Sequence, residues 1–141
     1  MESNTVNASI KINATPSQVW EVLTNPEKIA LYTGSKVETD WKAGSPISWT
    51  GEMQGAPYKN KGEVLEIRPA SLLRHTFWTG MGGDADQPEN YSEVAYTINE
   101  VPDNAVELTY SRTKIATETE VQIFQAHIRT MLEEIKRLSE E

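Results

Sequence analysis

The sequence predicts an α+β domain in which one long helix packs across a curved antiparallel sheet of about seven strands. The C-terminal quarter of the chain, 117–141, has the apolar spacing of a long amphipathic helix. Residues 36–114 show strand and turn signals and no helical period. Short connections between successive strands imply antiparallel neighbours. Because a twisted sheet of this size curls, we expect the long helix to lie in its concave side.

The long C-terminal helix is predicted to have one continuous apolar face. Its apolar residues recur at spacings of three and four, which places them on one side of a helix. They are Val121, Phe124, Ile128, Met131, Leu132, Ile135 and Leu138. No Gly or Pro interrupts the run. The other predicted helices are short, so a sheet must supply the large apolar surface that this face needs.

Polar residues indicate where this helix begins and which side faces water. Glu133 and Arg137 lie four residues apart in the favourable order for a surface ion pair. Two residue pairs have the spacing of a capping box, namely Thr117 with Glu120 and Thr119 with Gln122. Either pair would satisfy free backbone amides at the helix start.

The N-terminal part of the chain predicts one strand followed by two short helices. Residues 5–14 alternate apolar and polar side chains, which indicates a half-buried strand. Thr15 and Gln18 form a capping-box pattern, and Pro16 suits the first helical position. Asn25 ends this helix and caps a second one. The apolar residues expected on the second helix are Ile29, Leu31 and Tyr32.

The central part of the chain predicts six strands joined by turns rich in Gly, Pro, Asn and Asp. The expected strands are 36–41, 45–51, 58–68, 72–79, 91–99 and 105–114, with turns at 42–44, 53–57, 69–71 and 101–104. One connection is long, the Gly-rich and acidic segment 80–90. Loops of this length in a compact domain are usually functional or mobile. We therefore expect this loop to be mobile and to lie near the mouth of any cavity.

Composition limits the classes of function that the chain can have. A chain of 141 residues most simply forms one domain, here 1–141. Its net charge of −8 argues against binding to nucleic acid or to an anionic membrane surface. It has no Cys, which excludes disulfides, thiol nucleophiles and thiolate metal sites. No signal peptide and no apolar run of about 20 residues is present, so we expect a cytoplasmic protein without a membrane span.

No set of residues in the sequence specifies a reaction or a bound metal. The chain has two His residues, His75 and His127, at a spacing that matches no metal motif. No nucleophile-elbow motif is present. An acid or base inside a cavity would have to be chosen from Glu93, Tyr96, Arg112 and His127. We therefore expect no catalytic residue, no metal and no cofactor.

The order and spacing of these segments resemble a known family. The matching segments are 14–32, 37–49, 61–78 and the amphipathic C-terminus. Together they resemble the activator of heat-shock-protein-90 ATPase homologue-like family, within the START/SRPBCC (birch-pollen-allergen-like) superfamily. The resemblance implies a helix-grip fold with an apolar cavity between helix and sheet. It implies varied roles, from ligand binding and co-chaperone action to cyclase or lipid-transfer activity in distant branches, and the fold does not choose among them.

The aromatic residues favour ligand binding among these roles. Ligand pockets are mostly apolar and aromatic, with a few polar groups that orient the ligand. We expect non-enzymatic binding of a small hydrophobic or aromatic molecule between the C-terminal helix and the sheet. The residues expected to line the cavity are Trp49, Trp78, Tyr96, Tyr110, Phe124 and His127. The alternatives are a protein-interaction module that resembles the co-chaperone domain, with a protein partner, and a cyclase-like enzyme.

Overall fold

The structure is a computed structural model that describes residues 5–79, 85–115 and 118–141. Its helices and strands follow the predicted order of strand, two helices, six strands and one long helix. In chain order they are β1 (Val6–Ile12), α1 (Pro16–Thr24), α2 (Pro26–Thr33), β2 (Lys36–Thr39), β3 (Pro46–Met53), β4 (Ala56–Arg68), β5 (Leu72–Thr79), η2 (Pro88–Asn90), β6 (Ser92–Val101), β7 (Ala105–Thr113) and α3 (Glu118–Glu140).

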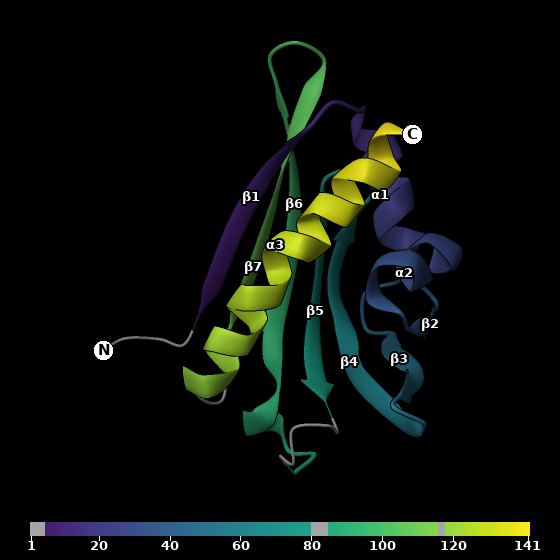
Figure 1. Cartoon of the computed structure of the whole chain (residues 1–141), viewed down its shortest axis with the longest axis vertical. Helices are drawn as coiled ribbons and strands as arrows, with labels where there is room; N and C mark the ends of the chain where they lie inside the picture. Colours follow the sequence, from purple (N-terminus) through teal and green to yellow (C-terminus); the bar gives the residue numbers. More distant parts are fainter. Residues whose placement is uncertain (1–4, 80–84, 116–117) are drawn as a thin grey trace.

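The strands form one seven-stranded sheet in the order β1-β7-β6-β5-β4-β3-β2. Every neighbouring pair is antiparallel. α3 crosses the strands diagonally on one face of this sheet, and α1 and α2 lie beside it toward β2 (Figure 1). This architecture confirms the predicted α+β class and the helix-grip arrangement. None of the helices in the described ranges is long and apolar enough to cross a membrane.

The predicted caps of the two short helices are confirmed. The Thr15 hydroxyl accepts a hydrogen bond from the Gln18 amide at 3.1 Å, and the Gln18 side chain accepts one from the Thr15 amide at 2.8 Å. Asn25 Oδ1 accepts from the Glu27 amide and thereby caps α2. Gly34 ends α2 with a φ of +74°, a conformation that side chains other than Gly rarely adopt. The expected start of α3 at Thr117 lies outside the described residues.

Two strand predictions are corrected by turn and bulge geometry. Gln54 and Gly55 both have positive φ, so they form a two-residue turn, and β3 and β4 extend to its edges. The register of β4 against β5 shifts between Val64 and Glu66, which is a β-bulge. Because of this bulge, Val64 and Ile67 both contribute to the same hydrophobic cluster although they lie three residues apart.

The interior contains two hydrophobic clusters instead of one continuous core. The larger cluster joins β1, β6, β7, α1 and the C-terminal half of α3, and it includes the fully buried Ile12, Leu108 and Ile135. The smaller cluster joins α2 and β2–β4 around Trp49. Tyr32 and Phe77 pack against both clusters. The space between the clusters is where the candidate site lies.

Burial confirms the predicted apolar face of α3 and corrects two details. Ile128, Leu132, Ile135 and Leu138 are buried, while Val121, Phe124 and Met131 are partly buried. Arg137 bonds Glu134 at 2.8 Å and Glu141 at 2.6 Å, so its expected pairing with Glu133 is wrong. Leu31 was expected on the apolar side of α2, but it is 65% exposed because that side of α2 is set by Ile29 and Tyr32.

Candidate functional site

A cavity of about 420 Å³ lies between α3, α2 and the concave face of the sheet. Both hydrophobic clusters contribute to its wall, which places the cavity at their junction. From the helices it is lined by Leu23, Ile29, Tyr32, Phe124, His127, Ile128 and Met131, among others. From the strands it is lined by Trp49, Asn60, His75, Phe77, Val94, Tyr96, Tyr110 and Arg112, among others. The volume falls within the range of small-molecule sites, which is roughly 300–1,000 Å³.

The cavity brings together all but one of the residues that the sequence predicts for it. Trp49, Tyr96, Tyr110, Phe124 and His127 line the wall. The prediction of Trp78 is wrong. Successive side chains of a strand point to opposite faces, and in β5 it is Phe77 that lines the cavity. The Trp78 ring instead stacks on Tyr91 at 6.3 Å, and its Nε1 donates to the Ala85 carbonyl at 3.0 Å.

The long loop is only partly described. Residues 80–84 lie outside the described ranges, so their expected mobility stays a prediction. Asp86 in the described part pairs with Lys61 and accepts a hydrogen bond from the Tyr91 hydroxyl. No residue of 85–90 lines the cavity, so this half of the loop does not form its wall.

Aromatic rings in mutual contact form the floor of the cavity. The Trp49 ring lies 5.1 Å from the rings of both His75 and Phe77. Tyr96 and Tyr110 meet edge to face at 5.3 Å. Such tilted contacts are the favourable geometry for aromatic pairs. The floor is therefore an ordered aromatic surface onto which a flat or apolar ligand can pack.

His75 is a neutral hydrogen-bonding group within this floor. Its Nδ1 lies 2.8 Å from the Thr76 carbonyl oxygen, and a carbonyl only accepts, so Nδ1 carries the proton. Burial, followed by the positive charge of Arg112, lowers the pKa of His75 to about 4, although the Thr76 carbonyl acts in the opposite direction. Near neutral pH the imidazole is therefore uncharged, with Nε2 left as an acceptor.

Arg112 is a buried cation in contact with two aromatic rings. The residue is 7% exposed, and its Cζ lies 3.5 Å from the Phe124 ring centre and 4.4 Å from that of Phe77. Nε donates to the Ser92 hydroxyl at 2.9 Å, and Nη1 lies 3.5 Å from the Tyr110 hydroxyl. Among the described residues, no carboxylate lies within ion-pair distance of its guanidinium.

Asn60 adds a second polar group without a partner. The residue is 8% exposed, lines the cavity, and has a buried Oδ1 with no hydrogen-bond partner in the described structure. Close by on the wall, the Ser35 and Tyr58 hydroxyls lie 2.6 Å apart and satisfy each other.

The geometry revises the set of residues available for acid–base chemistry. Tyr96, Arg112 and His127 line the cavity, and burial raises the pKa of Tyr96 well above its usual value. Glu93 does not line it, because it lies on the outer face of the sheet. His75, which was not selected from the sequence as an acid–base candidate, does line the cavity. Over residues 5–79, 85–115 and 118–141, no group of three or more His, Asp or Glu side chains could hold a metal ion.

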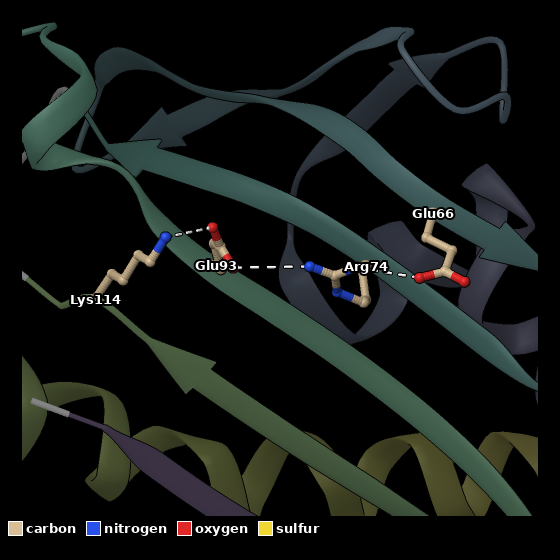
Figure 2. Close-up of polar contacts among 4 residues, drawn as sticks. All are labelled: Glu66, Arg74, Glu93 and Lys114. Atoms are coloured by element: carbon tan, nitrogen blue, oxygen red, sulfur yellow. Dashed lines mark hydrogen bonds and ion pairs between the residues drawn. The ribbon is translucent and has the colours of Figure 1, made fainter. Parts of the chain in front are cut away.

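The outer face of the sheet carries its own charged row. Figure 2 shows Glu66, Arg74, Glu93 and Lys114 side by side across β4–β7. Arg74 bonds Glu66 at 3.1 Å and lies 3.8 Å from Glu93, which bonds Lys114 at 2.9 Å. Hydrogen bonding to Arg74 lowers the pKa of Glu66. Exposed pairs of this kind contribute little to stability, so the row mainly keeps the outer face of the sheet polar.

Comparison with known proteins identifies similar sequences and folds. A family model described as Activator of Hsp90 ATPase homolog 1-like protein matches residues 13–140. The comparison with curated proteins found no match. Among solved structures, the protein ChR145 of Cytophaga hutchinsonii is 36% identical, with a TM-score of 0.82 over 97% of this chain and 94% of that one.

More distant solved structures share the fold alone. The protein CV1439 of Chromobacterium violaceum is 17% identical, with a TM-score of 0.78 over 98% of this chain and 99% of that one. The Aha1 dimer of Colwellia psychrerythraea is 16% identical, with a TM-score of 0.72 over 96% of each chain. At these identities the likeness describes the backbone and carries no information about the cavity.

Proposed function

The chain belongs to the family of activator of Hsp90 ATPase homolog 1-like proteins, and we propose that it binds a small, largely apolar ligand in the cavity between α3 and the sheet. Family members act generally as ligand-binding or co-chaperone-like domains. The observation that carries the proposal is the cavity of about 420 Å³ at the junction of two hydrophobic clusters. If the side chains of α3 packed against the sheet as one continuous core, they would fill this space and no cavity would remain.

The composition of the wall suits such a ligand. Aromatic and aliphatic side chains supply most of the surface, and Asn60, His75 and Arg112 supply a few buried polar groups that can orient a ligand. Removal of apolar ligand surface from water contributes about 25 cal/mol per Å², before the entropy lost on association is subtracted. A ligand that fills the cavity therefore gains from burial, and the polar groups determine which ligand fits.

We expect members of a mixed library of lipids, aromatic acids, flavonoids and polyketide-like compounds to shift backbone amide signals at the cavity wall. The measurement is two-dimensional amide NMR on the whole chain. Signals of α3 residues 124–131 and of β5–β7 should move together, because both sides of the cavity touch the ligand. Amides of the turn between β6 and β7, such as Asp103 and Asn104, are the internal control and should stay in place, because this turn does not line the cavity. If no compound of the library moves the signals of the cavity wall, the proposal is wrong.

One observation favours a protein partner as the second candidate. Leu31 on α2 and Ile123 on α3 are the large hydrophobic side chains that the described structure exposes, at 65% and 49%. An apolar side chain at the surface can bury its exposed area against a protein partner. This candidate requires the purified chain to stimulate the ATPase of a purified Hsp90, and a Leu31→Ser, Ile123→Ser variant to lose that stimulation. Equal ATPase rates with and without the chain would remove it.

A further inference from the structure

We propose that the ligand of this cavity carries a carboxylate, which Arg112 binds inside the cavity while the apolar or aromatic remainder lies against the walls. The inference rests on the proposed ligand-binding function and specifies the class of ligand, a monoanionic apolar acid. Three features of the described residues support it. They are an uncompensated buried cation, the geometry of its hydrogen-bond donors, and the charge balance of the cavity.

The first feature is the absence of a protein counterion. Arg112 is a buried residue, 7% exposed, and its guanidinium has no carboxylate within ion-pair distance in residues 5–79, 85–115 and 118–141. A buried charge is normally paired, because its loss of hydration is otherwise uncompensated. The rings of Phe77 and Phe124 recover part of this loss through cation–π contact. They do not neutralise the charge, so an anion is still favoured.

The second feature is the geometry of the guanidinium. Phe124 lies against it at 3.5 Å and Phe77 at 4.4 Å, so aromatic rings occupy part of its surroundings. Nε donates to Ser92, and Nη1 makes a long contact with Tyr110. Nη2 has no hydrogen-bond partner among the described residues, and Arg112 lines the cavity. A carboxylate that reaches Nη2 makes the charge-assisted contact that guanidinium groups favour.

The third feature is the charge of the cavity interior. His75 is neutral near pH 7, because burial and the nearby Arg112 lower its pKa to about 4. Glu134 also lines the cavity, but its carboxylate already bonds Arg137 at 2.8 Å on the exposed side of α3. Arg112 is thus the buried charge that needs a partner. One carboxylate balances it, whereas a phosphate dianion would leave an excess buried negative charge.

Matched probe pairs test the inference by calorimetry on the whole chain at about pH 7, where a free carboxylic acid is ionised. The pairs are 2-naphthoic acid with 2-naphthamide, and decanoic acid with decan-1-ol. Each acid should bind at least about tenfold more tightly than its neutral partner, a difference of about 1.4 kcal/mol. In Arg112→Gln this preference should vanish, because the affinity for the acid falls while the affinity for the neutral probe is unchanged. Arg112→Lys should retain part of the preference, since it keeps the charge and loses the planar fork.

Arg74→Gln is the matched control, because it makes the same substitution on the outer face of the sheet. It should leave the binding of every probe unchanged. Near-ultraviolet circular dichroism checks that Arg112→Gln is folded, and if it is not, the acid-to-neutral ratio of the unmodified chain decides alone. Equal binding of acid and neutral probe at the cavity overturns the inference and leaves the proposed function standing. A preference for the acid that survives in Arg112→Gln, or that is lost in Arg74→Gln, also overturns the inference. If none of the four probes binds, both the inference and the proposed binding of aromatic and aliphatic ligands are wrong.

Discussion

Ile135→Ala is expected to lower the free energy of unfolding by about 2–5 kcal/mol. Ile135 lies in the C-terminal half of α3, is 0% exposed, and belongs to the larger hydrophobic cluster that joins this helix to β1, β6 and β7. Truncation removes buried methyl and methylene groups and leaves a void that the rigid sheet cannot fill. Urea denaturation followed by circular dichroism measures the change, with the slope of the transition checked for constancy.

The chain provides a matched control for this substitution on the same helix. Ile123→Ala makes the same truncation at a residue that is 49% exposed. Its effect should stay within about 0.5–1 kcal/mol, because less apolar surface leaves the interior and no void forms. Glu133→Ala, on the exposed side of α3, should also have a small effect. Equal losses at the two isoleucines would contradict the assigned buried face of α3.

The helical spacing predicted which face of α3 is buried but not how deeply each turn is buried. The stripe from Val121 to Leu138 faces the sheet along its whole length, as expected. Leu132, Ile135 and Leu138 meet a filled core, whereas Phe124 and Met131 line the cavity and are partly buried. Periodicity reports the direction of a side chain. It cannot report whether the facing strands supply enough volume to meet it.

Turn chemistry and strand parity explain the other differences. Alternation alone gives β4 a regular pleat, whereas the bulge between Val64 and Glu66 reverses the pattern midway. In β5 the sequence indicates that one ring of Phe77–Trp78 faces inward without deciding which. The structure decides for Phe77, because it shares a face with Leu73 and His75. The sequence-based prediction therefore assigned the wrong one of these two neighbouring residues, Trp78 in place of Phe77, to the inward face of β5.

The polar groups of the site were the hardest to predict, although the sequence contains a signal for one of them. Arg112 continues the inward face set by Leu108 and Tyr110, two residues apart each time. Sequence reasoning weighed Arg112 only as an acid–base candidate, because an Arg in a strand is usually exposed and paired. His75 and Asn60 follow the inward parity of their strands in the same way. A charged residue at an inward position is thus the pattern that points to a binding group.

The neutral state of His75 has a consequence for stability in acid. Its pKa in the folded chain is about 4, lowered from the ordinary 6.5 by burial and then by Arg112. Between these values the unfolded chain binds a proton and the folded chain does not, so falling pH favours unfolding. The loss begins below about pH 6.5 and is complete below about pH 4, and it amounts to about 3 kcal/mol for this group.

His75→Phe should remove this component of the pH dependence while it keeps a ring against Trp49. The free energy of unfolding is measured at several values between about pH 7 and about pH 4 for the unmodified chain and for His75→Phe. The carboxylates whose pKa is lowered by ion pairs, such as Glu66 and Glu140, titrate in both proteins and cancel in the difference. The curve of His75→Phe should be flatter by about 3 kcal/mol. Parallel curves for the unmodified chain and His75→Phe would show that the imidazole is charged or solvated in the folded state, and the neutral acceptor assigned to the cavity floor would be wrong.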